Sequence, residues 1–300
     1  MNRALQAWKE ISFPLLFEDI SDLFGEFFLS LLEYLKDTVE HLILACIAYT
    51  LICIFLYLCI IKWKCLSFIR ESRNSRRVLF VTAHPDDECM FFGPTILHFT
   101  RKKDCIVYLI CLSTGKNYGM SSIRKKELYR SCEILGIDSS NIFIHDHTLL
   151  PDAMDVRWPT ELISEIVSRY VESLNITTII TFDRYGVSYH NNHTSIYYAV
   201  ANLILDRNLP KCCGVYVLET TNVLRKYWLF LDIPLSFLFS RFRYMVGFDD
   251  RDVIHKAMKR HKSQLMWFRR LYMYFSRYML INTLQQMNLV DIELDLEIDD

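Results

Sequence analysis

Residues 77–88 read RVLFVTAHPDDE, and this stretch decides the fold. Its first half is apolar and rich in β-branched side chains. A histidine and three carboxylates then follow within five residues, namely His84, Asp86, Asp87 and Glu88. An apolar run that ends in ionisable groups is typical of a buried parallel strand, whose carboxyl end is where open α/β sheets build their sites. Imidazole and carboxylate together are ligands for a divalent metal ion.

Short apolar runs and helical stretches alternate along the chain that follows. Strands are predicted at residues 78–82, 105–112, 141–144, 177–182 and 214–218, and helices between them at 93–99, 123–135, 160–174 and 193–205. Repeated βα units predict an α/β fold, a Rossmann-like parallel sheet with helices on both faces. Asn191 or Asn192 is predicted to cap the last of these helices.

A second polar cluster follows the fourth predicted strand. It reads DRYGVSYHNNH over residues 183–193 and ends in two histidines, His190 and His193. Loops after successive parallel strands meet at one sheet edge, so these histidines are expected to reach His84 and Asp87. Two histidines and one carboxylate leave a tetrahedral metal with an open position, which is typical of a catalytic site.

The open position of such a metal would hold a water molecule whose pKa the ion lowers. The first loop offers Asp86 to take the proton, and His190 can stabilise the oxyanion and the leaving group. Each motif alone is weak, because His-Pro-Asp often forms a turn and paired Asp residues often cap a helix. Their combination at one predicted sheet edge favours a metal centre.

Three further residues have two interpretations each. Arg124, at the start of a predicted helix near the sheet edge, is suited to hold a phosphate or a sugar hydroxyl, or is a solvated helix residue. Asp146 follows the third strand and either binds a sugar hydroxyl or caps the next turn. Glu88 is expected to support the helix start rather than to bind the metal.

A transmembrane helix is predicted at residues 42–61, which contain no charged residue and would span ~30 Å as a helix. The twenty residues after this run hold six basic residues, whereas the twenty before it hold one. The positive-inside rule therefore predicts that the later residues face the cytosol. The ten cysteines show no paired CxxC spacing, which fits a reducing compartment. A net charge of −1 excludes the basic field typical of nucleic-acid binding.

The motif AHPDDE with a later HxxH resembles the PIG-L family of zinc-dependent N-acetylglucosamine deacetylases. The similarity extends from about residue 77 to about residue 281 and includes RKKEL (124–128), TFDRYGVS (181–188), TNVLRKY (221–227) and SQLMWFRRLY (263–272). The last two stretches are typical of the eukaryotic branch, whereas AHPDDE is shared with bacterial members.

The resemblance implies roles for individual residues: His84, Asp87 and His193 as metal ligands, Asp86 as general base, and His190 as the group that stabilises the oxyanion and protonates the leaving amine. Zn²⁺ is the implied cofactor, although nitrogen and oxygen ligands also suit iron, cobalt or manganese. Asn192 stands where bacterial members often have an acidic residue.

The function implied is removal of the N-acetyl group from N-acetylglucosaminyl phosphatidylinositol, an early step of GPI-anchor biosynthesis. The expected partners are this glycolipid and the endoplasmic reticulum bilayer, with the catalytic domain in the cytosol and no nucleic acid. One alternative is deacetylation of another N-acetyl conjugate, which the membrane segment disfavours. Another is a catalytically silent membrane adaptor, which the five intact site residues disfavour.

The predicted layout has an amphipathic segment (1–41), the transmembrane helix (42–61), a basic linker (62–76), the deacetylase domain (77–285) and an acidic tail (286–300). Residues 224–248 and 266–279 mix aromatic and basic side chains, a composition typical of contacts with anionic lipid. Core packing with a basic rim is the alternative for both. Pro234 argues against a second spanning helix in the first of them.

Overall fold

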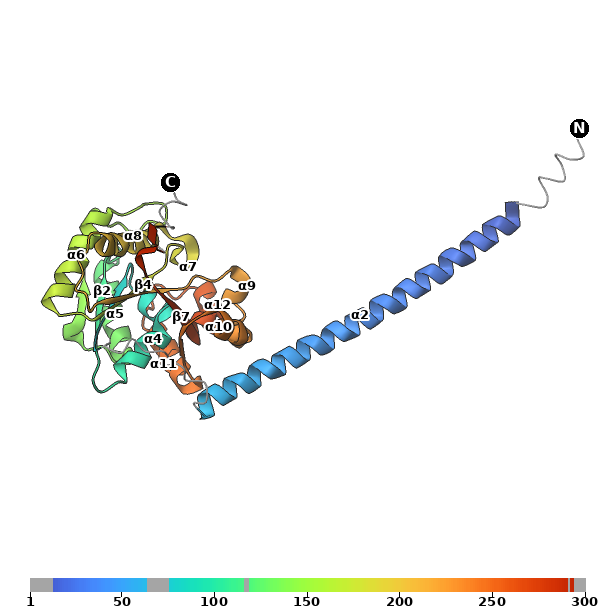
Figure 1. The fold of residues 1–300 in the computed structure, drawn as a ribbon, viewed down its shortest axis with the longest axis horizontal. Coiled ribbons are helices and arrows are strands. Elements are labelled where there is room, and N and C mark those ends of the chain that lie inside the picture. Colours follow the sequence, from blue (N-terminus) through green and yellow to red (C-terminus); the bar gives the residue numbers. More distant parts are fainter. Residues whose placement is uncertain (1–12, 64–75, 116–118, 291, 294–300) are drawn as a thin grey trace, which may run out of the picture. The chain divides into compact units, whose positions relative to one another are not determined.

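The computed structural model describes residues 13–63, 76–115, 119–290 and 292–293 (Figure 1). Most of the predicted basic linker and of the acidic tail, and the first twelve residues of the predicted amphipathic segment, lie outside these ranges. The chain divides into two units, Met1–Phe55 and Leu56–Asp300, and each is described by itself.

A single long helix, α2 (Phe13–Trp63), contains the predicted transmembrane segment. Its stretch Asp22–Ile61 is long and apolar enough, by length and composition, to cross a membrane. Large apolar side chains such as Leu42, Leu44, Leu51 and Phe55 are each more than 60% exposed. Such a continuous exposed apolar surface is costly in water, which supports the prediction of a lipid environment.

The second unit is built on a seven-stranded sheet with the order β3-β2-β1-β4-β5-β7-β6. Its strands are β1 (Arg77–Thr82), β2 (Ile106–Cys111), β3 (Ile142–Ile144), β4 (Thr178–Phe182), β5 (Gly214–Leu218), β6 (Phe242–Met245) and β7 (Ile281–Gln286). The first five are parallel, as predicted. Two strands that were not predicted extend this sheet, because β7 pairs antiparallel with β5, and β6 pairs antiparallel with β7.

Helices cover both faces of the sheet (Figure 1). The four predicted helices are confirmed as α4 (Gly93–Thr100), α5 (Ser121–Leu135), α6 (Thr160–Ser173) and α8 (Asn191–Leu205). The α6 helix packs on α8, whereas α4 and α5 pack with α11 (Phe248–Met258). The remaining elements are α3 (Asp87–Met90), α7 (Gly186–Tyr189), α9 (Val223–Lys226), α10 (Ile233–Phe239), α12 (Trp267–Phe275) and the 3-10 turns η2 (Ser139–Asn141), η3 (Leu229–Asp232) and η4 (Arg277–Met279).

The central strand β1 is the core of the sheet. Residues 78–81 have no exposed surface, and the Phe80 ring packs edge-on against Phe92, which packs in turn against Phe182. Fully burying side chains of this kind stabilises the fold by about 1.5–3 kcal/mol each. Burial on both faces leaves β1 rigid, so the loop that follows it starts from a fixed position.

A buried ion pair fixes the antiparallel edge of the sheet. Asp232, at the end of η3, lies 2.9 Å from the Nε of Arg277 in η4, and neither side chain is exposed. Arg277 also donates to Ser236 and to Thr283, which lies in β7. These contacts tie η3 and α10 to the sheet through charges that water cannot reach.

We expect Asp232→Ala to lower the free energy of unfolding by about 3–5 kcal/mol, because it leaves the Arg277 charge buried without its partner. The matched control is Asp252→Ala, which removes an exposed partner of Lys256 and costs less than about 1 kcal/mol. Denaturant unfolding of the detergent-solubilised chain, followed by circular dichroism, measures both. Equal stability of the two variants would contradict the structural role of the buried pair.

Candidate active site

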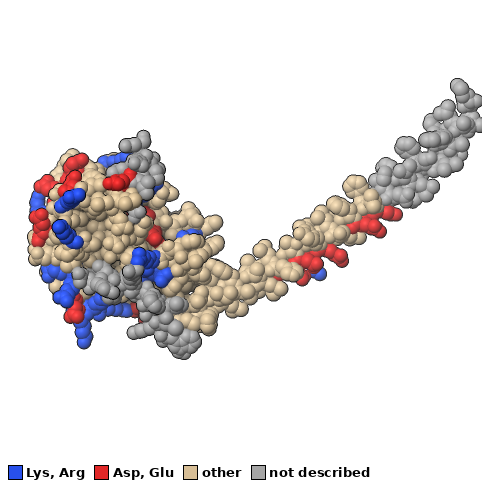
Figure 2. Space-filling model, in the orientation of Figure 1, with Lys and Arg blue, Asp and Glu red and all other residues tan. Residues whose placement is uncertain are grey.

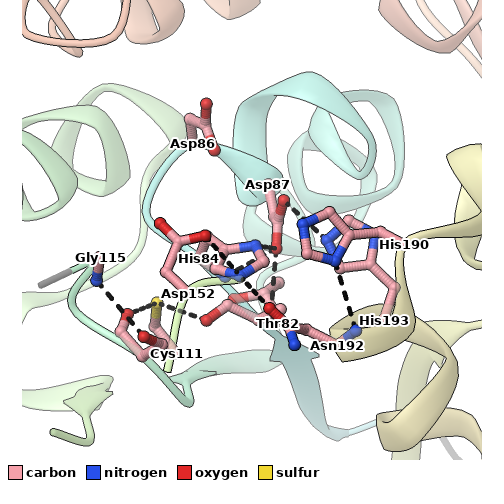
Figure 3. A network of polar contacts seen from close by, with 12 residues as sticks. Thr82, His84, Asp86, Asp87, Cys111, Gly115, Asp152, His190, Asn192 and His193 are labelled. Carbon is pink, nitrogen blue, oxygen red and sulfur yellow. Dashed lines mark hydrogen bonds and ion pairs between the residues drawn. The ribbon is translucent and has the colours of Figure 1, made fainter. Parts of the chain in front are cut away.

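The loop after β1 turns sharply at Asp86, whose φ of 114° lies in the left-handed region. A residue with a Cβ pays about 1–3 kcal/mol for such a conformation, and it persists only where its surroundings hold it. The Glu88 carboxylate accepts from the backbone N–H of Asp86 at 2.9 Å, and the Asp86 carbonyl accepts from Met90 N. The strained turn separates the carboxylates of Asp86 and Asp87, which point in different directions (Figure 3).

Backbone hydrogen bonds orient the Asp87 carboxylate. Its Oδ2 accepts from the N–H groups of Ala83 and His84 at 2.9 and 2.8 Å. Its Oδ1 lies 3.5 Å from the Nε2 of His193, which is too long for a good hydrogen bond. The Oδ1 atom of this buried carboxylate therefore faces the imidazole of His193.

His193, near the start of α8, is held by stacking and by one backbone acceptor. Its ring lies flat on Phe182, with centroids 4.0 Å apart, and its Nδ1–H donates to the Gly186 carbonyl at 2.9 Å. The φ of Gly186 is +55°, and a Cβ there would lie 2.7 Å from the His193 Cβ, so glycine is required. In the neutral ring, Nδ1 carries the proton and Nε2 a lone pair, and Nε2 is buried with no hydrogen-bond partner. Burial lowers the pKa of His193, but the Asp87 carboxylate raises it above its ordinary value, and a cation at this position would favour the neutral ring.

His84 is oriented by Asn192. The amide of Asn192 donates to the Val156 carbonyl, which fixes its orientation, and its Oδ1 accepts from His84 Nε2 at 2.9 Å. The lone pair of His84 is then on Nδ1, which lies 3.8 Å from Asp87 Oδ2. Neither Asn191 nor Asn192 caps α8 as predicted, because the cap is His190, whose Nδ1 accepts from Asn192 N at 3.3 Å.

The residues present fit a divalent metal ion. Ligand atoms of His84, Asp87 and His193 all lie within 4.8 Å of one another, and all three residues are buried. Two neutral imidazoles and one carboxylate are a donor set typical of catalytic zinc sites. The unpartnered lone pair on His193 would otherwise cost about 1–3 kcal/mol, and a cation would remove this cost.

A second group of possible ligands overlaps the first and consists of His84, Asp152 and His190. Asp152 lies 3.2 Å from His84 Nε2 but also forms an ion pair with Arg124 at 2.8 Å. Because Arg124 already neutralises this carboxylate, the buried group with Asp87 is the better cation site.

His190 stacks on His193 with ring centroids 4.8 Å apart and lies 4.9 Å from His84 (Figure 3). Burial, followed by repulsion from the charges of His193 and His84, lowers the pKa of His190 to about 4. The ring is therefore neutral near pH 7. Since Nδ1 accepts from Asn192 N, its proton is on Nε2, which makes it a hydrogen-bond donor.

Asp86 faces a different partner. Its Oδ2 forms an ion pair with Nη1 of Arg269 in α12 at 2.6 Å, and its carboxylate stands outside the contacts that join His84, Asp87 and His193 (Figure 3). Burial raises the pKa of Asp86 to about 6, against the opposing effect of Arg269. For Asp87, burial acts in the same direction, but His193 and His84 hold its pKa below the usual range.

The less specific sequence predictions have different outcomes. Arg124 is buried at the edge of the site, where it binds Asp152, so it is not a solvated helix residue. Asp146 accepts a hydrogen bond from Thr114 and belongs to neither of the ligand groups that contain His84. Glu88 accepts from Asp86 N, from Ser131 and from His261, as expected of a supporting residue.

Sequence reasoning missed Asp152, Arg269 and the contact of Asn192 with His84. Asp152 lies in an irregular loop that offers no periodic signal. Arg269 lies in SQLMWFRRLY, where its place among aromatic residues suggested only a surface role. The sequence also did not predict a pocket of about 630 Å³ beside the site. Residues that line this pocket include Arg157, Trp158, Tyr189 and Asn191, whereas His84, Asp87 and His193 do not line it.

The family model described as PIG-L, GlcNAc-PI de-N-acetylase, matches residues 79–204. An N-acetylglucosaminyl-phosphatidylinositol de-N-acetylase from Bos taurus is 47% identical over 210 residues, covering 69% of this chain and 82% of the relative. A probable enzyme of the same name from Dictyostelium discoideum is 35% identical and covers 70% of this chain and 92% of the relative.

Among solved structures, N,N'-diacetylchitobiose deacetylase from Pyrococcus horikoshii superposes with a TM-score of 0.53 at 15% identity, over 79% of this chain and 92% of that chain. This likeness shows a shared fold. The identity of the Bos taurus and Dictyostelium discoideum proteins to this chain, over most of their own length, shows that the chain belongs to the PIG-L family of deacetylases.

Proposed function

We propose that the protein hydrolyses the N-acetyl group of N-acetylglucosaminyl-phosphatidylinositol and releases glucosaminyl-phosphatidylinositol and acetate, an early step of GPI-anchor biosynthesis. The names of the relatives supply the substrate. The observation that carries the chemistry is the buried, unpartnered Nε2 of His193 beside Asp87 and His84. Folding alone does not require a buried histidine without a hydrogen-bond partner, because an apolar side chain at position 193 would cost less free energy.

His84, Asp87 and His193 would hold the metal ion, for which Zn²⁺ is the first candidate. When bound, a divalent ion polarises an amide carbonyl and makes water more acidic. The chain's own contribution is to orient both imidazoles. Asn192 fixes the ring of His84, whereas the Gly186 carbonyl and Phe182 fix that of His193.

Asp86 is the proposed general base. Its raised pKa of about 6 keeps it ionised near pH 7 yet basic enough to take a proton from the attacking water. His190 is the proposed donor to the oxyanion through Nε2–H, and it then stands beside the leaving amine. Arg269 is the group that holds the Asp86 carboxylate while it is ionised.

The proposed location is the endoplasmic reticulum membrane, with α2 as a single-pass anchor and the deacetylase domain in the cytosol. The basic residues after residue 61 support this orientation. We propose the same segments as those predicted from the sequence, with boundaries at residues 41, 61, 76 and 285. Deacetylation of a different N-acetyl conjugate and a silent adaptor remain the rival functions. An assay of acetate release from the glycolipid separates the proposed function from both rivals.

Removal of the metal tests the ligand assignment. We expect a chelator to abolish acetate release and His84→Ala or His193→Ala to lower the bound metal, measured by mass spectrometry of the purified chain, by at least about tenfold. His147→Ala, which changes an exposed histidine outside the ligand groups, is the control and keeps its metal. Full metal content in both ligand variants would refute the site.

The base assignment is tested by Asp86→Asn, which keeps the shape of the side chain but cannot accept a proton. We expect kcat to fall by about 10²–10⁴-fold. Metal content should stay at the wild-type level, because Asp86 is not among the ligands. Acetate release at the wild-type rate would show that another group takes the proton.

The ion pair with Asp86 predicts a positioning role for Arg269. Arg269→Ala should lower kcat by about tenfold or more, because it leaves the buried Asp86 carboxylate without the opposite charge that lies 2.6 Å away. Arg269→Lys should restore part of kcat, and Arg260→Ala, an exposed arginine, should leave it unchanged. If Arg269→Ala raised KM while kcat stayed constant, Arg269 would bind substrate rather than position the base.

A further inference from the structure

The α12 helix places its apolar side outward. Its residues Trp267, Phe268, Leu271, Tyr274 and Phe275 follow the spacing i, i+1, i+4, i+7, i+8, which puts them on one helix face, and each is 49–71% exposed. The opposite face packs inward with Arg269, Tyr272 and Met273. A surface helix in contact with water has the reverse arrangement, so this face requires an apolar partner.

Two neighbouring helices extend this surface. Tyr227, at the end of α9, contacts the Tyr272 ring of α12, and α9 and α10 both pack on η3. The three helices lie together on one side of the unit (Figure 1). The exposed apolar side chains that α9, α10 and the two residues after α9 add are Val223, Leu224, Tyr227, Trp228, Leu238 and Phe239.

The surface is continuous with the end of the membrane-spanning candidate. Tyr57 forms a small core with Ile233 of α10 and with Leu280, and Ile60 and Ile61 pack against the same core. The apolar stretch of α2 ends at Ile61. The end of that stretch, residues 57–61, therefore packs with α10, and a chain that crosses a bilayer through α2 would leave it near this surface.

The few exposed charges of this surface are basic, which suits an anionic partner. Within the residues that form α9, η3, α10 and α12, the sole acidic side chain is Asp232, which is fully buried and paired with Arg277 and Arg225. Arg270 of α12 and Arg241, just after α10, are exposed. Charged side chains gather on the side of the unit that carries α5 and α6, whereas the side with α9 and α10 is largely uncharged (Figure 2).

We propose that the outward faces of α9, α10 and α12 form a surface that rests in the head-group region of a phospholipid bilayer containing anionic lipid. This inference rests on the membrane insertion of α2 proposed above, and not on the deacetylase chemistry. Aromatic and basic side chains together are suited to this region. Since Arg269 on the inner side of α12 contacts Asp86, only the thickness of one helix, about 10–12 Å, separates lipid from the site.

Photo-crosslinking of the full chain tests this surface. A benzophenone amino acid is introduced singly at Leu238, Phe239 or Trp267, and the chain is reconstituted in vesicles of phosphatidylcholine with a minor fraction of phosphatidylinositol. The same probe at Ile47 reports whether α2 is inserted in the bilayer. At Ile106 of β2 or Tyr129 of α5, which are exposed residues, the probe reports the background level of lipid crosslinking. The probe is itself large and aromatic, so it preserves the character of each surface position.

We expect lipid adducts at the three surface positions to exceed those at Ile106 and Tyr129 several-fold and to approach the yield at Ile47. Adducts at Ile47 together with background yield at Leu238, Phe239 and Trp267 would overturn the proposal while leaving the anchor intact. Cross-links to a second copy of the chain at these positions would overturn it in favour of a protein interface. Background yield at Ile47 would refute the anchor and the surface together, whereas metal content would still test the chemistry separately.

Discussion

Three consecutive carboxylates are buried at the end of β1, and the need to compensate their charges organises this half of the protein. Asp86, Asp87 and Glu88 are each 3% exposed or less. A buried carboxylate is tolerated only with an opposite charge or several hydrogen bonds, so three adjacent ones need three separate sets of partners. Asp86 has Arg269, Asp87 has two backbone N–H groups and two histidines, and Glu88 has His261 and Ser131.

These three sets of partners come from distant parts of the chain. The histidine that faces Asp87 across the sheet edge comes from α8, His261 from the turn after α11, and Arg269 from α12. The three carboxylates therefore draw the carboxyl-terminal segment over the loop that follows β1. Of the three carboxylates, Asp87 is the one that faces two histidines, and it is the carboxylate around which the proposed metal ligands gather.

The parts of the fold that could be predicted from sequence are those that repeat a local pattern. The five parallel strands are short apolar runs, and polar loops after two of them suffice to predict a shared edge. The strand β7 could not be found in this way, because its buried positions include Asn282 and Thr283. These are polar side chains satisfied by Thr95, Phe91 and Arg277, which lie elsewhere in the chain. Arg269 was missed for the same reason, since its partner lies far away in the sequence.

The polar contacts on the inward face of α12 explain why its outward face is mainly apolar. The helix contributes Arg269 to Asp86 and the hydroxyl of Tyr272 to the Met90 carbonyl, so its polar atoms are committed to the loop that carries the proposed base. Apart from Arg270, the large side chains on its outer face are aliphatic or aromatic, and their contact with water is unfavourable. One short helix thus joins the surface proposed for lipid to the carboxylate proposed for catalysis. A displacement of α12 by seating in lipid would be transmitted to Asp86 through a 2.6 Å ion pair. For a substrate whose lipid part stays in the bilayer, the proposed lipid surface and the proposed base would together couple the position of the membrane surface to the geometry of the reaction.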